Sequence, residues 1–113
     1  MLEVTRHGQR APEKIFDLAA DPKENFKTPH NLSYIGAASH HQTGSMLREK
    51  IDSLDPKFLS HTYDPNEIYV QSTCHSRCVD SAIAQLEGLY DLPLQFPEVD
   101  KSFEITTIIC NED

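Results

Sequence analysis

The sequence predicts an α/β protein in which a mainly parallel sheet is flanked by helices. Three stretches carry this prediction: the apolar run from Leu2 to Val4, the β-rich run Glu67–Thr73, and the β-rich run Phe103–Cys110. An amphipathic helix pattern over Ser76–Tyr90 follows the second run. Strand, loop and helix in that order are typical of parallel strands joined by a crossover helix. At 113 residues the chain has room for one small domain.

Composition narrows the classes of partner. The formal net charge of −8 would repel nucleic-acid phosphates, so we predict no nucleic-acid partner. No apolar run is long enough to cross a bilayer, so we predict no membrane span. Hydrophobic residues make up 38% of the chain and charged residues 25%, which is typical of a folded globular protein. Nothing in the sequence calls for a cofactor.

The first strand predicted, Leu2 to Thr5, leads into a loop with unusual chemistry. Arg6, His7 and Arg10 lie within five positions, with Gly8 among them. Two planar guanidinium groups suit a tetrahedral oxyanion such as phosphate. The imidazole is a nucleophile near neutral pH, and the glycine lets the backbone approach a ligand closely. The same residue types also occur in ordinary solvated loops, so a lone arginine-histidine-glycine would define no site.

The first long helix is predicted over Ser33–Ile51. Ser33 is a good N-cap, and the residues before it are predicted to be mostly loop because two X-Pro steps disfavour a helix. One face carries residues at steps of three and four, with small side chains that would pack closely against a sheet. These residues are Ala37, His40, Gly44, Leu47 and Ile51. We expect His40 to be packed and His41 to be exposed, because adjacent helical positions point in different directions.

The second half alternates connections and regular elements. The polar connection Asp52–Asn66 contains Phe58 and Leu59, which we expect to dock onto the domain. The run Glu67–Thr73 is predicted as a strand and Ser76–Tyr90 as a helix ended by Pro93. The continuous apolar half of Phe103–Cys110 predicts a buried strand.

The three cysteines, Cys74, Cys78 and Cys110, leave an odd number within one chain. Cys74-His75-x-x-Cys78 with the distant Cys110 offers possible zinc ligands, which would make the chain a small zinc-binding interaction module. The spacing is not that of a standard finger, and a second close pair is absent. We therefore expect free, partly buried thiols and no metal.

The complete string Arg6-His7-Gly8-x-Arg10-x-Pro12 resembles the signature of the histidine acid phosphatases, the acid phosphatase and phytase branch of the histidine phosphatase superfamily. The resemblance implies a three-layer, phosphoglycerate mutase-like fold and hydrolysis of small-molecule phosphomonoesters. It implies that His7 becomes phosphorylated and that Arg6 and Arg10 bind the phosphate. The pattern Leu32-Ser33-x-x-Gly36-x-x-x-His40-x-x-x-Gly44 also resembles this family.

A second stretch extends the resemblance. Residues Val70, Ser72, Thr73, Arg77, Ser81 and Ala82 match a strand and helix start of the family. The resemblance implies that the arginine before serine-threonine is a third phosphate ligand, and this chain has the uncharged Gln71 at that position. Losing a charge-assisted contact to phosphate costs roughly 1.5 to 3 kcal/mol. We expect Arg77 to be structural, in an ion pair or a helix-start contact.

The resemblance covers residues 1–113 as the N-terminal part of one histidine phosphatase domain, without the cap and the later strands. The family's late histidine-acid pair, which supplies the general acid, has no match, because none of the six histidines precedes Asp or Glu. A non-catalytic or truncated relative that keeps an anion site is therefore the alternative to an acid phosphatase. The phosphoglycerate-mutase-like branch is a weaker match because Arg10 and Pro12 favour the phosphatases.

The family suggests the secretory pathway or a lysosome-like compartment, yet no signal peptide precedes the motif. We expect an incomplete gene model or a processed piece that lacks a leader. A three-strand piece would leave sheet edges and helix faces uncovered, so we also expect marginal stability.

Overall fold

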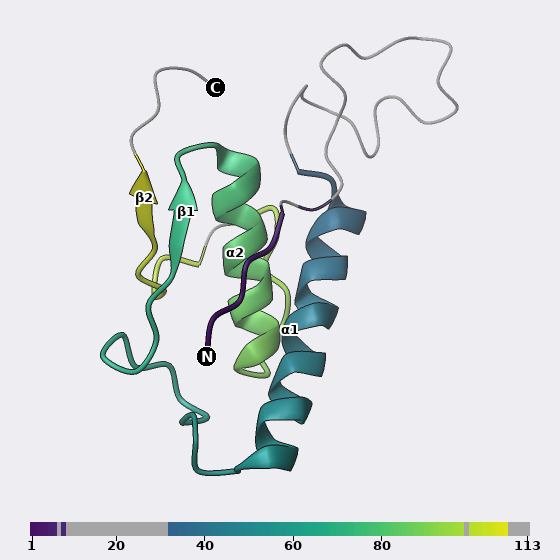
Figure 1. Cartoon of the computed structure of the whole chain (residues 1–113). Helices are drawn as coiled ribbons and strands as arrows, with labels where there is room; N and C mark the ends of the chain where they lie inside the picture. Colours follow the sequence, from purple (N-terminus) through teal and green to yellow (C-terminus); the bar gives the residue numbers. More distant parts are fainter. Residues whose placement is uncertain (7, 9–31, 99, 109–113) are drawn as a thin grey trace, which may run out of the picture.

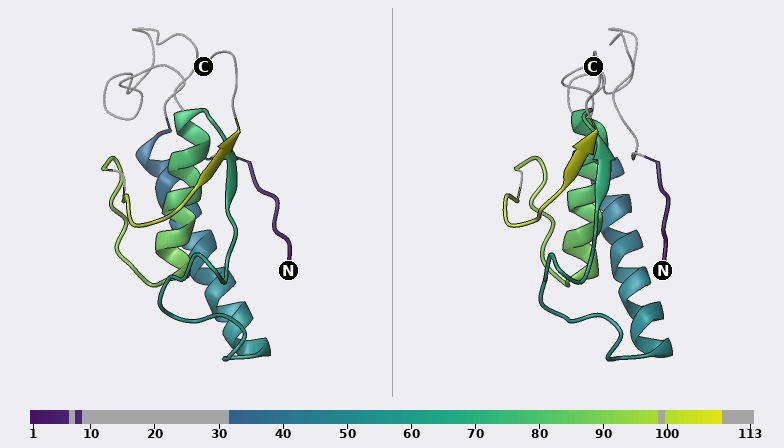
Figure 2. Two further views of the ribbon diagram at one scale, coloured as in Figure 1. Left: turned by 90° about the vertical axis from the view of Figure 1, so that its left-hand side faces the viewer. Right: turned by 60° about the vertical axis from the view of Figure 1, so that its left-hand side comes forward.

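The computed structural model describes residues 1–6, 8, 32–98 and 100–108. Along the chain it contains helix α1 (Tyr34–Leu54), strand β1 (Gln71–Thr73), helix α2 (Ser76–Leu89) and strand β2 (Thr106–Ile108). The two helices lie side by side, and the two strands run together beside α2 (Figure 1). Residues 1–6 cross the helix pair toward the beginning of α1 (Figures 1 and 2).

Helix α1 begins where the sequence predicts it. Ser33 is its N-cap, and the Ser33 hydroxyl accepts a hydrogen bond from the Gly36 backbone N–H at 3.1 Å. The helix extends three residues beyond the predicted end, to Leu54. Its buried face includes Ala37, His40, Gly44 and Ile51 as predicted, together with Gly36 and Arg48. The packed His40 is thus confirmed.

The partner of that face differs from the prediction. We expected the small residues of α1 to pack on a sheet, but α1 packs on α2, with the two helices running in the same direction (Figure 1). A Cβ on Gly44 would strike the Gln85 carbonyl, and one on Gly88 would strike the His41 carbonyl. Two glycines facing the opposite backbone therefore allow close contact of the helices, and the helix pair is the centre of the described structure.

The parallel pairing of the sheet is confirmed, but the strands are shorter than predicted. Strands β1 and β2 are parallel, with Gln71 opposite Thr106 and Thr73 opposite Ile108. Residues 67–70 do not belong to β1. The three residues of β2 are all exposed, so the predicted burial of this run is wrong within its described part. Its outer edge has no strand beside it among the described residues, which explains the exposure.

The predicted first strand is also wrong. Residues 2–5 are not in a strand, and the side chains of Leu2 and Val4 are 87% and 86% exposed. An apolar run predicts a buried strand only when neighbouring strands and a covering layer exist, and the described residues supply a sheet of two strands. The predicted loop after the motif, residues 12–31, lies outside the described residues.

The larger of the two apolar clusters joins the helix pair to the connections that follow each helix. It contains Ile51, Leu59, Ile83, Leu86, Leu89, Tyr90 and Phe103. Tyr63 packs edge-on against Tyr90 and Phe103, with ring centroids 5.6 and 5.0 Å away. Leu59 docks as predicted, whereas Phe58 is 55% exposed.

A buried arginine joins the helix pair to the connection after α1. The Nε of Arg48 donates to the Leu89 carbonyl at 2.8 Å, and its two terminal nitrogens donate to the carbonyls of Leu59 and Ser60 at 3.0 and 2.9 Å. Asp52 lies 3.3 Å away, and the guanidinium stands over the Tyr90 ring. The charge is thus surrounded by acceptors, which is how a buried arginine is tolerated. Among the described residues, no helix is long and apolar enough to span a membrane.

Candidate functional site

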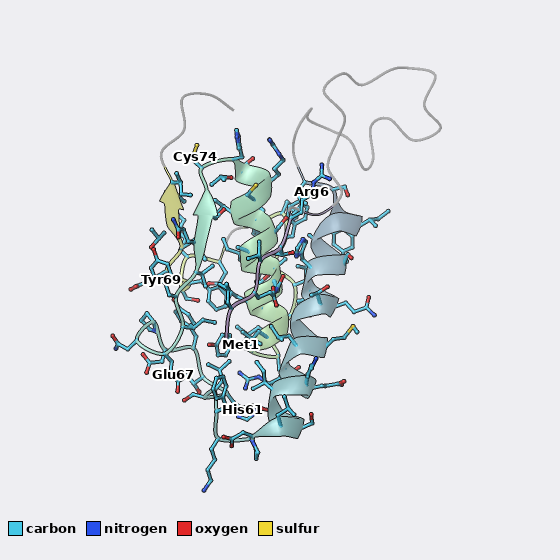
Figure 3. All side chains as sticks on the ribbon, in the orientation of Figure 1. Met1, Arg6, His61, Glu67, Tyr69 and Cys74 are labelled. Atoms are coloured by element: carbon cyan, nitrogen blue, oxygen red, sulfur yellow. The ribbon has the colours of Figure 1, made fainter. Side chains whose placement is uncertain are left out.

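One end of the molecule gathers the features that the sequence singles out. Strand β1 ends there, both helices begin there, and Arg6 and Cys74 lie at this end, while His61 lies at the other (Figure 3). In α/β proteins, ligands bind outside the carboxyl ends of the strands. The first turns of helices also present unpaired N–H groups and a partial positive charge, which favour anions.

The backbone on both sides of residue 7 is bonded to the helices. The carbonyl of Arg6 accepts from the Nε2 of His40 on α1 at 2.9 Å. The N–H of Gly8 donates to the Ser81 hydroxyl on α2 at 3.0 Å. A Cβ on Gly8 would lie 2.6 Å from the Gly36 carbonyl oxygen, so only glycine fits against α1 here. His7 and Arg10, the predicted nucleophile and second phosphate ligand, lie outside the described residues.

The side chain of Arg6 is exposed and forms no ion pair with any residue that the structure describes. Its backbone, in contrast, is held by His40. Because the backbone of Arg6 is fixed by a hydrogen bond and its guanidinium group is exposed, the guanidinium is available to a ligand. The role of Arg6 as a phosphate ligand stays a prediction.

Two polar atoms at the start of α2 are buried and unpaired. The Nε of Arg77 and the Nδ1 of His75 have no hydrogen-bond partner. His75 is the N-cap residue of α2, yet its side chain makes no capping bond. Arg77 has no ion pair within the described part of the chain, so the structural ion pair expected for it is not found. Buried polar atoms without partners are rare and cost free energy unless a ligand or water satisfies them.

Gln71, the third predicted phosphate ligand, is the first residue of β1 and is exposed. The carboxyl end of the strand is Thr73, two residues later. Arg77 lies in the first turn of α2, which follows this strand end, and it carries a positive charge that Gln71 lacks. Sequence reasoning set Arg77 aside, and the signal that could have found it was a cation in the first turn of a helix that follows a strand end.

The cysteines behave differently from the expectation of free thiols. Cys74 is disulfide-bonded, so that expectation is wrong for this residue, whereas Cys78 is a free thiol. A sulfur in a disulfide is not a thiolate and does not ligate zinc. In the residues that the structure describes, no group of three His, Cys, Asp or Glu side chains could hold a metal ion.

Burial affects two acidic side chains of α2, Asp80 and Glu87. Burial raises the pKa of the Asp80 carboxyl, and burial also raises the pKa of Glu87. Both residues line a small pocket against the segment after α2, together with Ile83, Ala84, Phe96 and Glu98. This pocket is separate from the strand end, and its carboxylates would repel a phosphate, so we do not assign it as the site.

Fold and site together define the class: an α/β protein with arginines presented at the end of a parallel strand. The family model of the histidine phosphatase superfamily (branch 2) matches residues 1–105, and the chain belongs to this family.

Individual relatives support the same assignment. The chain is 34% identical over 88 residues to lysosomal acid phosphatase of Bos taurus, covering 75% of this chain and 19% of that protein. It is 31% identical over 90 residues to prostatic acid phosphatase of Mus musculus, covering 77% of this chain and 22% of the relative. Testicular acid phosphatase of Mus musculus is 34% identical over 118 residues, covering 97% of this chain and 26% of the relative. The chain thus spans about a fifth to a quarter of the length of these relatives.

Proposed function

We propose that this chain carries the phosphate-binding part of a phosphomonoesterase of the acid phosphatase type. In this proposal His7 is the nucleophile, and Arg6 and Arg10 bind the oxygens of the phosphoryl group. The substrate is a small-molecule phosphomonoester. Membership in the histidine phosphatase superfamily and the similarity to lysosomal, prostatic and testicular acid phosphatases support the reaction class.

One observation of the structure supports the proposal most. The residues before and after residue 7 are bonded to different helices, at the end of the molecule where β1 stops and both helices start. A nucleophile needs a defined backbone because a misplacement of about 1 Å costs on the order of 100-fold in rate. Two bonds at the flanking residues are the kind of support that such a nucleophile requires.

The chemistry follows from the residue types. An imidazole nitrogen of His7 attacks phosphorus, a P–N bond forms, and the P–O bond to the alcohol breaks. The bonding electrons leave with the alkoxide, which takes a proton from an acid or from water. Water then attacks phosphorus, the P–N bond breaks, and inorganic phosphate and free His7 result. The guanidinium groups stabilise the charge on the equatorial oxygens in both steps.

We extend the proposed phosphate site to Arg77. Its Nε is buried at the start of α2 without a partner, and a phosphate oxygen would supply one. Gln71 remains a candidate ligand that donates through its amide. The variant Gln71→Arg tests its place: vanadate binding should tighten by about tenfold if residue 71 faces the anion, by the scale for a charge-assisted contact. Unchanged affinity in a calorimetric titration would remove Gln71 from the site.

The alternative is an anion-binding relative without turnover. The neutral Gln71, at a position where an arginine is expected, favours it. We also propose that residues 1–113 form the N-terminal part of a single histidine phosphatase domain. The disulfide at Cys74 favours an oxidising compartment for it.

A chromogenic phosphomonoester at acidic pH tests the proposal. We expect turnover by the wild-type chain and its loss in His7→Ala. The matched control is His61→Ala, because His61 is an exposed histidine at the opposite end, bonded to Asp52. Equal turnover by His7→Ala and wild type would refute the proposed nucleophile. Vanadate binding without turnover would select the alternative.

A further inference from the structure

His40 is a buried histidine that the proposed reaction does not use. It is 8% exposed and lies on α1, between the N-terminal segment and α2. Its Nε2 lies 2.9 Å from the Arg6 carbonyl oxygen, and its Nδ1 lies 3.1 Å from the Oε1 of Gln85. Both ring nitrogens are therefore engaged, and one of them holds the residue that precedes the proposed nucleophile.

The donors and acceptors in this chain of contacts can be assigned. The Nε2 of Gln85 donates to the carboxylate of Glu3, which fixes the amide so that its Oε1 faces His40. The Arg6 carbonyl is an acceptor only. Both ring nitrogens of His40 thus face acceptors, and a neutral imidazole has one N–H while a protonated imidazole has two. Only the cationic form of His40 satisfies both contacts.

Ser81 holds the other side of residue 7. Its hydroxyl accepts from the Gly8 N–H and donates to the Arg77 carbonyl at 2.6 Å. Ser81 is 2% exposed, so the hydroxyl has little water to turn to. The N-terminal segment itself is largely exposed, with Met1, Leu2 and Val4 each more than 80% accessible. These side chains make few apolar contacts, so the hydrogen bonds of residues 6 and 8 restrain the backbone of the segment more than apolar packing does.

We propose that His40 and Ser81 are a pair of positioning residues that fix the backbone on both sides of residue 7, with His40 acting as an imidazolium that donates to Arg6 and Gln85. This inference deepens the proposed function and rests on it for its catalytic consequence. The structural part, a backbone restrained by two helices, does not depend on catalysis. Neither residue touches the phosphoryl group.

Amide hydrogen exchange of the 113-residue chain tests the restraint without any turnover. The protection factor of the Gly8 amide should fall at least tenfold in Ser81→Ala and recover in Ser81→Thr, which keeps the hydroxyl. It should also fall in His40→Ala, while His61→Ala leaves it unchanged. Unchanged Gly8 protection in both alanine variants would overturn the proposal.

A measurement on the wild type covers the case in which the variants fail to fold. Nitrogen chemical shifts of the His40 ring at pH 5.5 should show both nitrogens protonated, and a neutral tautomer at that pH would overturn the imidazolium. In phosphatase assays, Ser81→Ala and His40→Ala should lower kcat about 10- to 100-fold with little change in KM, and Ser81→Thr should restore kcat. If the wild type turns over substrate and a variant loses Gly8 protection but keeps its kcat, the positioning role is overturned. Protection without any wild-type turnover would count against the proposed function alone.

Discussion

Two arginines at opposite ends of the helix pair show how differently one residue type is used. Arg48 is buried, and its guanidinium donates to three backbone carbonyls and lies near Asp52. Arg77 lies in the first turn of α2 at the other end, and its Nε is buried with no partner. The fold completes the hydrogen bonds of the first arginine and leaves those of the second incomplete.

The same contrast holds for histidines. His61, at the Arg48 end, is paired with Asp52 at 2.9 Å in solvent, and this hydrogen bond holds the pKa of Asp52 below its usual range. His75, at the other end, has a buried Nδ1 without a partner. Unpaired buried polar atoms occur at both ends, since the Tyr90 hydroxyl and the Oε2 of Glu87 also lack partners. Among the described residues, however, the unpaired buried nitrogens of basic side chains lie at the start of α2, and such nitrogens are what an anion could satisfy.

The largest expected effect comes from separating the helices on which both ends depend. Gly88→Val places side-chain atoms where the His41 carbonyl lies, so α1 and α2 must move apart. We expect a loss of more than about 3 kcal/mol in the free energy of unfolding, at or above the usual range for overpacking. Urea denaturation followed by circular dichroism measures it. Ser39→Ala, on an exposed position of α1, is the control, and equal midpoints for the two variants would contradict the close helix contact.

The next largest effect comes from removing the guanidinium group of the buried Arg48. Arg48→Met keeps most of the side-chain volume but leaves the carbonyls of Leu89, Leu59 and Ser60 without their donor. We expect a loss of about 2 to 4 kcal/mol in stability, because several buried acceptors lose a charged partner. Phosphate or vanadate affinity of the folded fraction should not change. A variant as stable as the wild type would show that Arg48 is not the structural arginine.

Arg77→Met is the matched change at the other end and should give the opposite pattern. Stability should change by less than about 1 kcal/mol, because the buried Nε has no protein partner to lose. Vanadate affinity should fall about 10- to 100-fold, which corresponds to the 1.5–3 kcal/mol of a bond to a charged group. Calorimetry measures the affinity. If Arg77→Met destabilises the chain as much as Arg48→Met and leaves vanadate binding intact, the contrast between the two ends is wrong.

The smallest effect concerns Glu87, a buried carboxyl in the last turn of α2. Burial raises the pKa of Glu87 in the folded chain, so the folded state holds this proton more tightly than the unfolded state does. Its contribution to stability is present at low pH and is lost as pH rises from the ordinary glutamate pKa through the raised value. Glu87→Gln keeps an oxygen for the Gln95 N–H and should remove this loss. Denaturant midpoints at pH 4 and pH 7 check it, and an identical pH dependence in wild type and variant would contradict the raised pKa.

Local sequence signals predicted the helices well. The Ser33 cap, the stepwise apolar positions and the strand-helix order are short-range features, and α1, α2 and the parallel pairing agree with them. Burial of the strands could not be predicted from such signals. Leu2, Val4 and Ile108 are apolar but exposed, because burial depends on neighbouring layers that a local pattern does not report.

At the site, the sequence motif predicted which residues come together at this end of the molecule, but it did not predict the side chains that hold their backbone. The bonds from His40 to Arg6 and from Ser81 to Gly8 join residues 34 and 73 positions apart. Such pairs follow from the tertiary fold alone. The disulfide at Cys74 was missed for a related reason, because an odd cysteine count does not say which thiols meet. The roles of His7, Arg10 and Gln71 stay predictions.

We propose above all that His7, beside Arg6 at this end of the molecule, accepts a phosphoryl group. The most direct measurement is peptide mapping by mass spectrometry after incubation with a nitrophenyl phosphate and an alkaline quench. The good leaving group of this substrate needs little help from a general acid, so the outcome does not depend on one. We predict a phosphoryl group on His7 that is absent from the His7→Ala chain. No phosphorylation of His7, or equal phosphorylation of the distant His61, would contradict the claim.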